Sequence, residues 1–523
     1  MKDEYDVVVA GGGLAGLTSA AYLCRAGLQT LLCERRKKTG GLVETFWHQG
    51  FAFDAGIRAF ENSGIVFPML KDLGIDIEFT KNEVAIGIGN QSVKLTSQDS
   101  VNNYMSMLKD FFPDDASGIE RIEKVIRKVM SYMNVLYGID NPLFIRKIDL
   151  DYLIKTLLPW FFKYQVNIRK ASRLNEPIQT YLHRFTKNNA LIDMIIQHFF
   201  KKTPAFFALS YFSLYLDYCY PIGGTGILAE KMTDFIKSAG GEILIGTGVV
   251  QVDAGNHQIE LENGTMIKYK SLIWAADQRT LYNITKGINT ACFRKQHKLS
   301  QKSKGGDSIL TVFLGVNQDE SYFKERCGAH MFYTPNTIGL SSLPPWEEPI
   351  KSGSDGVFCW MDSYLERTTF EIACSVIRDS TLAPEGKAGL TISTLLDYGL
   401  VKLVSDGGDY ERFKEFCIQK IVAVLEKSLF PGFQKLILFK LCATPLSLEK
   451  ETFNSEGAIT GWSFTNPELP CENRFKRITK AIHTPIPDVY QCGQWTFSPS
   501  GLPVSIVTGK LAADQVQKKQ RKT

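Results

Sequence analysis

Tyr5 to Glu34, YDVVVAGGGLAGLTSAAYLCRAGLQTLLCE, is the stretch around which the rest of this 523-residue chain is organised. Asp6 to Ala10 is a short apolar run rich in β-branched residues, which predicts a strand. Three glycines break the run, and apolar residues then recur at helical spacing from Leu14 to Ala26. A second apolar strand is expected from Thr30 to Cys33. The order strand, glycine turn, helix, strand predicts an α/β fold.

The glycines of this stretch have the spacing of a dinucleotide-binding turn. Gly11 would make the tight turn, Gly13 would let the backbone approach a pyrophosphate, and Gly16 would let the helix pack on the strand. The phosphates are then expected at the free N–H groups of Leu14 and Ala15, at the positive end of the helix.

Glu34 ends the second predicted strand, where an acid can bind both hydroxyls of a ribose. A basic run, Arg35 to Lys38, follows it directly. Two interpretations of the run remain open. It is either a solvated edge, or one or two of its cations, with Arg35 the first of them, screen the adenosine end of a dinucleotide.

Composition excludes several classes of protein. The net charge of +5 is spread over 115 charged residues, which is too dilute for a nucleic-acid partner, and no nucleic-acid-binding motif occurs. The eleven cysteines include no C-x-x-C and have no regular spacing, which favours buried free thiols in a reducing compartment. No metal-ligand spacing stands out.

The first residues and the hydropathy bear on localisation. Charged residues lead from Met1 straight into the first strand, so we expect no cleavable signal peptide. No window reaches about eighteen uninterrupted apolar residues, so a membrane-spanning helix is not expected. The expected localisation is cytoplasmic, with or without peripheral membrane contact.

Short motifs after Glu34 narrow the fold to a family. Gly40-Gly41, Thr45, Phe53-Asp54 and Gly56 follow at the spacing found in the large flavoprotein family of amine oxidases, protoporphyrinogen oxidase and carotenoid desaturases. The chain resembles this family over nearly its whole length. The resemblance implies FAD, and not NAD, as the cofactor. It places Glu34 on the FAD ribose and the Gly40-Gly41 turn along the pyrophosphate and flavin. Leu42 stands where many members have Arg, but that contact is largely through the backbone.

A second glycine-rich loop, Tyr220 to Gly226, resembles the P-x-G-G motif of the same family. We expect no strand before it, so it does not predict a second dinucleotide fold. A strand from Glu242 to Val250 and a hairpin closed at Asn263-Gly264 should follow. In relatives Val249 or Val250 would contact adenine through its backbone.

The C-terminal part resembles the family's last FAD motif, a strand, a glycine, a short loop and a helix. The strand and glycine lie in Val489 to Trp495, and the helix is expected from Val504 to Val516. Many relatives have Gly-Asp where this chain has Gly493-Gln494. The cofactor residues that the motif implies, around the flavin pyrimidine and ribityl chain, are Gly493, Gln494, Gly501, Leu502 and Pro503. The basic tail Lys518 to Lys522 is expected to be a frayed end.

Two sequence segments resemble one branch of the family in particular. Ser375 to Gly386 and Thr444-Pro445 resemble the branch of carotenoid desaturases, carotenoid isomerases and retinol saturases. The region from about 301 to 444 is expected to alternate strands and loops, with strands at Ser308 to Leu314 and Val357 to Met361. A long helix is expected from Tyr410 to Leu429.

Residues 99 to 219 have helical patterns, with Ile119 to Met133 apolar at every third or fourth position. Between residues 143 and 170, aromatic and aliphatic residues are interleaved with cations, a mixture suited to an anionic membrane surface, although core packing with a basic outer face is an equal alternative. These cations are Arg146, Lys147, Lys155, Lys163, Arg169 and Lys170. The aromatic run from Phe199 to Tyr220 predicts either the wall of an apolar pocket or simply core.

The fold class expected is α/β, a Rossmann-like FAD-binding domain with a parallel sheet, joined to an α+β substrate domain with a helical part for which membrane association is one of the two interpretations. The expected division is 1–98 for the first part of the FAD domain, 99–219 for the helical part, 220–300 for the second FAD part, 301–444 for the substrate sheet and helix, and 445–523 for the C-terminal FAD part.

These features are compatible with three functions. The first is an FAD-dependent oxidoreductase that desaturates, saturates or isomerises a long apolar polyene or isoprenoid lipid by hydride transfer at flavin N5. The second is an FAD oxidase of amines or tetrapyrroles, against which the lack of a clear aromatic cage argues. The third is a flavin-free lipid carrier like the GDP dissociation inhibitors. With a single dinucleotide fold, an external electron acceptor or donor is expected: a quinone, oxygen or a separate reductase.

Arg58, two residues beyond Gly56, is the one candidate catalytic residue. In relatives this turn leads along the flavin into the substrate cavity, so a cation here would stabilise reduced flavin or bind an acidic head group. The alternative is an ion pair with Glu61 on the surface of a turn, which ordinary Arg behaviour favours.

Overall fold

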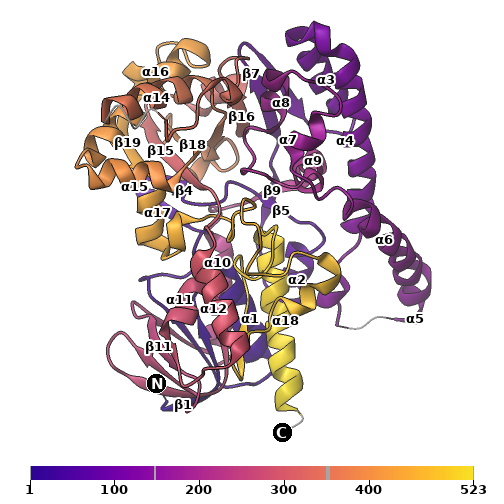
Figure 1. Cartoon of the computed structure of the whole chain (residues 1–523), viewed down its shortest axis with the longest axis vertical. Helices are drawn as coiled ribbons and strands as arrows, with labels where there is room; N and C mark the ends of the chain where they lie inside the picture. The colour runs from indigo at the N-terminus through magenta and orange to yellow at the C-terminus, as the bar shows by residue number, and fades with distance from the viewer. Residues whose placement is uncertain (1, 147–148, 349–353, 522–523) are drawn as a thin grey trace.

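The computed structural model describes residues 2–146, 149–348 and 354–521. Figure 1 shows a lower part that carries both termini, an upper sheet covered by helices, and a helical part beside that sheet. The chain crosses between the lower and upper parts several times, because strands and helices from distant stretches of sequence build each of them.

The lower part contains the predicted dinucleotide-binding sheet. β1 pairs in parallel with β2 and β13, β2 pairs in parallel with β10, and β13 pairs in parallel with β20. The strands of this sheet, in spatial order, are β10 (Glu242–Ile245), β2 (Thr30–Glu34), β1 (Glu4–Ala10), β13 (Met266–Trp274), β12 (Gln258–Leu261), β11 (Val249–Asp253) and β14 (Thr285–Lys286), with β20 (Val489–Gln491) beside β13.

Helices cover the faces of this sheet, as an α/β sheet buried on both sides requires. α1 (Leu14–Arg25) packs against α10 (Ile227–Ser238) and α18 (Leu502–Gln520). α11 (Gln278–Ile284) and α12 (Ala291–Lys302) lie near β11 in Figure 1. The strand, turn and helix predicted from Tyr5 to Glu34 are therefore confirmed.

The upper sheet is antiparallel except between β16 and β7, which run parallel. Its order is β19 (Ile437–Ala443), β15 (Ser308–Val316), β18 (Ala388–Leu396), β17 (Phe370–Cys374), β16 (His330–Thr334), β7 (Val84–Ile88) and β8 (Gln91–Leu95). β7 and β8 come before residue 98, so the first stretch of the chain contributes strands to both sheets.

Helices around the upper sheet complete its core. They are α13 (Glu320–Arg326), α14 (Ser354–Arg367), α15 (Tyr398–Asp406), α16 (Tyr410–Ser428) and α17 (Pro445–Thr452). The helical part beside them contains α3 (Ser100–Phe111), α4 (Ala116–Leu136), α5 (Leu150–Tyr152), α6 (Leu158–Ala171), α7 (Ile178–Leu182), α8 (Asn189–Ile196) and α9 (Ala205–Leu214). α4 buries the apolar face predicted from Ile119 to Met133.

Small elements join the two parts. β3 (Thr45–His48) pairs with β4 (Phe51–Asp54), and β9 (Tyr218–Pro221) pairs antiparallel with β5 (Phe60–Glu61) and β6 (Phe79–Lys81). α2 (Val66–Leu73) follows β5. A strand therefore does precede the second glycine-rich loop, so that expectation was wrong. Because β9 is antiparallel and lies outside the large sheets, the loop still does not open a second dinucleotide fold.

Three other expectations need correction. Val357 to Met361 is part of helix α14 and not a strand. The strand predicted from Glu242 to Val250 is broken into β10 and β11 by Gly246 at positive φ and by Thr247-Gly248. The tail is not frayed, since α18 continues to Gln520 and the ammonium group of Lys519 pairs with Asp488. Lys522 lies outside the described residues.

α5 and α6 project from the side of the helical part (Figure 1). Six large apolar side chains on this segment are exposed: Leu150, Ile154, Leu158, Phe161, Phe162 and Val166. None of the helices in the described part of the chain is both long and apolar enough to cross a bilayer. Lys147, another cation of the predicted membrane segment, lies outside the described residues.

Candidate functional site

A single cavity of about 430 Å³ extends between the lower and upper parts of the protein. Its lower half, here called the cofactor half, is lined by the glycine turns of the dinucleotide fold. Its other half, here called the aromatic chamber, is walled by Phe199, Phe200, Tyr211, Tyr215, Tyr218 and Phe332. The chamber therefore continues directly from the predicted flavin site.

Two glycine turns form the backbone cradle of the cofactor half. The amide of Gly40 donates to the carbonyl of Gly12 over 2.8 Å, and Gly13 forms a parallel bridge with Gly40. A Cβ placed on Gly13 would meet no atom within 4 Å, because its free side faces open space. Such a bare backbone surface is what a pyrophosphate requires for close approach. The cradle therefore fits the diphosphate of FAD.

Gly16 has the packing role predicted for it. A Cβ at this position would lie 1.9 Å from the carbonyl oxygen of Gly11, so only glycine lets α1 approach the turn. Gly56 is constrained in the same way, since its Cβ would lie 1.9 Å from the carbonyl oxygen of Leu42. Both glycines fix the paths of the segments that line the cavity.

The structure places most, but not all, of the predicted cofactor residues at the cavity. The residues that line it are Gly11, Gly13, Leu14, Ala15, Glu34, Arg35, Gly40, Gly41, Leu42, Val249, Gly493, Gln494, Gly501 and Leu502. Gly16, Val250 and Pro503 do not line it. Val250 is 36% exposed, so of the two valines only Val249 is placed to contact a ligand in the cavity.

The N-termini of two helices open onto the cofactor half. α1 begins after Gly13 and α18 begins after Gly501, and neither helix has a side-chain cap. The N–H groups of Leu14 and Ala15 in α1 and of Leu502 in α18 are thus free to bind phosphate or carbonyl oxygens, whereas Pro503 has no N–H group. Gly493 contacts both helices. A Cβ on it would lie 3.3 Å from the Cβ of Ala15 in α1, and its amide donates to the hydroxyl of Thr508 in α18 over 3.0 Å.

Glu34 lies at one end of the cofactor half. Its Oε2 accepts from the amide of Gly12 over 2.6 Å, and its Oε1 accepts from the amide of Arg36 over 2.8 Å. Burial raises the pKa of this carboxyl, while those two amides oppose the change. Each oxygen retains a lone pair for a ribose hydroxyl.

Arg35, next to Glu34, is not a simple solvated residue. It lines the cavity, pairs with Glu262 over 2.7 Å, and holds its guanidinium 4.6 Å from the centre of the Phe453 ring. Phe453 has φ +57°, a backbone conformation that bulky residues rarely adopt. This pair of side chains borders the end of the cavity that Glu34 occupies.

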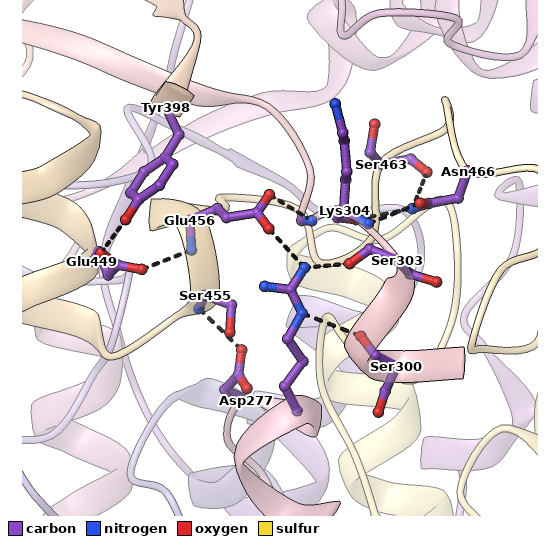
Figure 2. Close-up of polar contacts among 12 residues, drawn as sticks. Asp277, Ser300, Ser303, Lys304, Tyr398, Glu449, Ser455, Glu456, Ser463 and Asn466 are labelled. Carbon is purple, nitrogen blue, oxygen red and sulfur yellow. Dashed lines mark hydrogen bonds and ion pairs between the residues drawn. The ribbon is translucent and has the colours of Figure 1, made fainter. Parts of the chain in front are cut away.

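A polar network holds Ser455 and Glu456, which follow Phe453 in the chain, against the dinucleotide domain (Figure 2). Arg279 of α11 pairs with Glu456 over 2.7 Å and also donates to the carbonyls of Ser300 and Ser303. Asp277 caps α11 through the amide of Thr280, and its other oxygen accepts from the amide of Ser455.

We expect Arg279→Met to release bound flavin about tenfold faster, equivalent to about 1.4 kcal/mol of lost interaction in a partly buried ion pair. Flavin fluorescence after dilution of the holoprotein measures the release rate. Lys414→Met, which removes a surface ion pair with Glu411 on α16, is the control. Equal release rates for wild type and Arg279→Met would show that the network does not retain the cofactor.

Asp54, in the Phe53-Asp54 motif, connects this motif to the second glycine-rich loop. The buried carboxylate accepts from the hydroxyl of Thr45, from the amide and hydroxyl of Thr225, and from the hydroxyl of Tyr220, all at 2.7–2.9 Å. The residues that carried the family resemblance thus brace one another around the cofactor half.

Arg58 is buried, with only 3% of its surface exposed, and it lines the cavity. Its Nη1 donates to the carbonyls of Asp54 and Gly56, both at 2.5 Å, and its Nη2 donates to the hydroxyl of Ser393 over 2.9 Å. The predicted surface ion pair with Glu61 is wrong. Burial lowers the pKa of Arg58, opposed by the negative charges of Glu371 and Asp54.

The aromatic chamber also contains two carboxyl groups and two imidazoles that sequence reasoning did not place there: Glu61, His198, His330 and Glu371. Burial, with Asp217 nearby, raises the pKa of Glu61 to about 7. Burial lowers the pKa of His198 to about 4. His330 Nε2 lies 2.9 Å from Glu371 Oε1. These residues stand apart in sequence, and only strand pairing and chain reversal bring them together.

Comparison with known proteins agrees with this geometry. The model of the family described as flavin containing amine oxidoreductase matches residues 14–316. Prolycopene isomerase of Daucus carota is 24% identical, covering 84% of this chain and 69% of the relative. All-trans-retinol 13,14-reductase of Danio rerio is 24% identical, and the match covers 94% of this chain and 83% of the relative. Phytoene desaturase (lycopene-forming) of Pantoea ananas is 22% identical, covering 97% of each chain.

The fold also recurs in solved structures. An oxidoreductase from Methanosarcina mazei superimposes with a TM-score of 0.59 at 13% identity, covering 98% of this chain and 99% of that one. This likeness concerns the arrangement of the two sheets and the helices around them.

Proposed function

This chain belongs to the flavin containing amine oxidoreductase family, and from that premise we propose that it is an FAD-dependent oxidoreductase of a long apolar polyene or isoprenoid lipid. The observation that carries the substrate class is the single cavity that joins the glycine cradle to the aromatic chamber. A long conjugated or allylic chain can lie along such rings in van der Waals contact. The transfer of its apolar surface from water into the chamber is favourable because of the hydrophobic effect.

The residues of the chain would bind and orient the cofactor. The Gly11–Gly13 and Gly40-Gly41 turns and the N-terminus of α1 would hold the diphosphate, Glu34 the ribose, and the N-terminus of α18 the flavin end. FAD supplies hydride acceptance or donation when bound. Arg58 would set a positive charge beside the reaction space, and the aromatic walls would exclude water from it.

The electron partner is proposed to be external. Among the residues that the structure describes, one dinucleotide-binding sheet is present, and the second glycine loop follows an antiparallel strand. A quinone, oxygen or a separate reductase would therefore exchange electrons with the flavin.

The function is tested by incubating the purified holoprotein with phytoene, prolycopene and all-trans-retinol in separate vesicle preparations. Each is run with a quinone under air as electron acceptor and, in parallel, anaerobically with dithionite as electron donor. Products are identified by chromatography and mass. A product with two hydrogens fewer marks desaturation, one with two more marks saturation, and an unchanged mass with a new retention time marks isomerisation. If the protein contains bound FAD and converts none of these three polyenes, the proposed substrate class is contradicted.

We further propose that α5, α6 and the π-helical residues Leu153–Leu157 between them contact an anionic membrane surface. The support is the exposed apolar side chains of this segment together with Lys155, Lys163, Arg169 and Lys170. Exposed apolar residues next to cations suit the boundary between head groups and acyl chains. A lipid substrate would then reach the protein without crossing water.

Lys155→Glu with Lys163→Glu is expected to reduce binding to phosphatidylserine vesicles in flotation, since each surface cation contributes about 1 kcal/mol. Added salt should weaken wild-type binding as well. Lys124→Glu, an exposed lysine on α4, is the matched control. If the protein binds neutral and anionic vesicles equally, or if the double variant binds as well as the wild type, the segment is an ordinary protein surface and not an anionic-membrane contact.

A further inference from the structure

Glu371 occupies the middle of a row of side chains across the upper sheet. In register, Phe332 of β16 pairs with Glu371 of β17, Glu371 pairs with Ser393 of β18, and Ser393 pairs with Thr311 of β15. Directly opposed residues point to the same face of a sheet. Phe332, Glu371 and Ser393 all line the cavity, so this face is a wall of the aromatic chamber.

A chain of hydrogen bonds fixes the proton on His330. Arg378 Nη1 donates to Asn82 Oδ1 over 2.7 Å, and because a guanidinium has no acceptor, the amide oxygen must face it. Asn82 Nδ2 is then left to donate to His330 Nδ1, 3.2 Å away. The neutral imidazole must carry its proton on Nε2, which donates to Glu371 Oε1 over 2.9 Å.

The charges that face Glu371 come from several elements. Arg58 donates to the neighbouring Ser393, and Arg378 lies behind Asn82. His198, whose ring centroid lies 5.1 Å from that of Phe332, is a nearby titratable group but is neutral at pH 7, because burial lowers its pKa to about 4. Burial alone would raise the pKa of Glu371, but the His330 hydrogen bond and the Arg58 cation outweigh it and lower the pKa. Burial and the two arginines lower the pKa of His330, against the pull of Glu371.

The free side of Glu371 is open to the chamber. Its side chain is 31% exposed, whereas that of His330 is 2% exposed. Oε1 is engaged by His330, and no hydrogen bond reaches Oε2 from any residue in the described ranges. A carboxylate with one oxygen held and the other facing a substrate space has the arrangement of a general base.

We propose that Glu371 accepts the substrate proton in a desaturation step, with His330 as its positioning residue. The inference rests on the proposed function. One C–H bond of the substrate breaks and its electron pair leaves as hydride to the oxidised flavin. The C–H bond on the adjacent carbon breaks, its proton moves to Glu371 Oε2, and its electron pair forms the new C=C bond. The substrate loses two electrons and the flavin gains two.

The first arm of the test needs no substrate. Infrared difference spectra of the holoprotein, wild type against Glu371→Gln, report the carbonyl stretch of a protonated Glu371 as the pH is lowered. We expect this band only at acid pH. His330→Leu should shift its appearance to higher pH, and His330→Gln, which keeps an N–H donor, should shift it less. A protonated Glu371 at pH 7 in the wild type would overturn the proposal.

The second arm measures flavin reduction after anaerobic mixing with phytoene, prolycopene or all-trans-retinol. With the polyene that reduces the wild-type flavin, Glu371→Gln is expected to bind FAD normally and to be at least about 100-fold slower. Glu83→Gln, an exposed carboxylate next to Asn82, should react at the wild-type rate.

The outcomes of this arm are distinguishable. Equal rates for wild type and Glu371→Gln would overturn the role of Glu371 and leave the proposed function standing. A wild-type flavin that none of the polyenes reduces would overturn the desaturation step and the proposal for Glu371 with it. The proposed function would fail only if, in addition, none of the polyenes is converted in the product assay.

Discussion

Gly13→Val is expected to give a folded but colourless protein. Gly13 has φ −68°, which any residue tolerates, and a Cβ there would touch nothing within 4 Å. The valine side chain would therefore project into the space of the cradle, where the pyrophosphate of FAD must approach the backbone. The fold should survive while cofactor binding is lost. Absorption spectroscopy of the purified variant measures the flavin, and circular dichroism measures the fold.

A graded series separates this effect from misfolding. Gly13→Ala should retain part of the flavin because its methyl group fills less of the cradle. Gly16→Val should instead disrupt folding, since its Cβ would lie 1.9 Å from the carbonyl oxygen of Gly11. Stoichiometric flavin in Gly13→Val would refute the placement of the cofactor in the cradle.

Arg58→Leu is expected to bind FAD, to exchange electrons with substrate at least tenfold more slowly, and to be less stable. Tenfold corresponds to about 1.4 kcal/mol of lost transition-state stabilisation. The substitution leaves the carbonyls of Asp54 and Gly56 and the hydroxyl of Ser393 without their buried donor. A buried acceptor that loses its donor typically costs about 1–3 kcal/mol of stability.

Stopped-flow absorbance of the flavin and chemical denaturation measure the two effects of Arg58→Leu. Because the Arg58 cation helps to lower the pKa of Glu371, its loss should also move Glu371 protonation to higher pH. Arg58→Lys keeps the positive charge but cannot make all three hydrogen bonds of the guanidinium. Its rate of electron exchange should therefore lie between those of the wild type and Arg58→Leu. Wild-type flavin kinetics and substrate affinity in Arg58→Leu would remove Arg58 from the site.

The dinucleotide domain could be predicted because its signals are local. The strand, turn and helix from Tyr5 to Glu34 lie within thirty residues, and each glycine is required by a turn or a close approach. The Phe53-Asp54 motif could be recognised but not explained from sequence. The structure supplies the reason, since the Asp54 carboxylate joins Thr45, Thr225 and Tyr220 across distant segments.

The aromatic chamber was harder to predict, because its residues come from distant parts of the sequence and only the register of the strands brings them together. His330 and Glu371 are 41 positions apart, and neither belongs to a recognisable motif. The error at Val357 to Met361 had a different cause, because a short apolar run fits a strand or a helix equally well. The signal that could have decided it is the helical spacing of Val357, Met361 and Leu365, all buried on one face of α14.

Anaerobic mixing of the oxidised wild-type protein with a polyene, followed by flavin absorbance, tests the central claim most directly. The account predicts that the protein is purified with bound FAD. At least one of phytoene, prolycopene and all-trans-retinol should reduce the oxidised flavin, reoxidise the chemically reduced flavin or be isomerised by it, whereas an amine such as putrescine should not reduce it. Protein that neither contains nor binds FAD, or a flavin reduced by the amine and unchanged by every polyene, would contradict it.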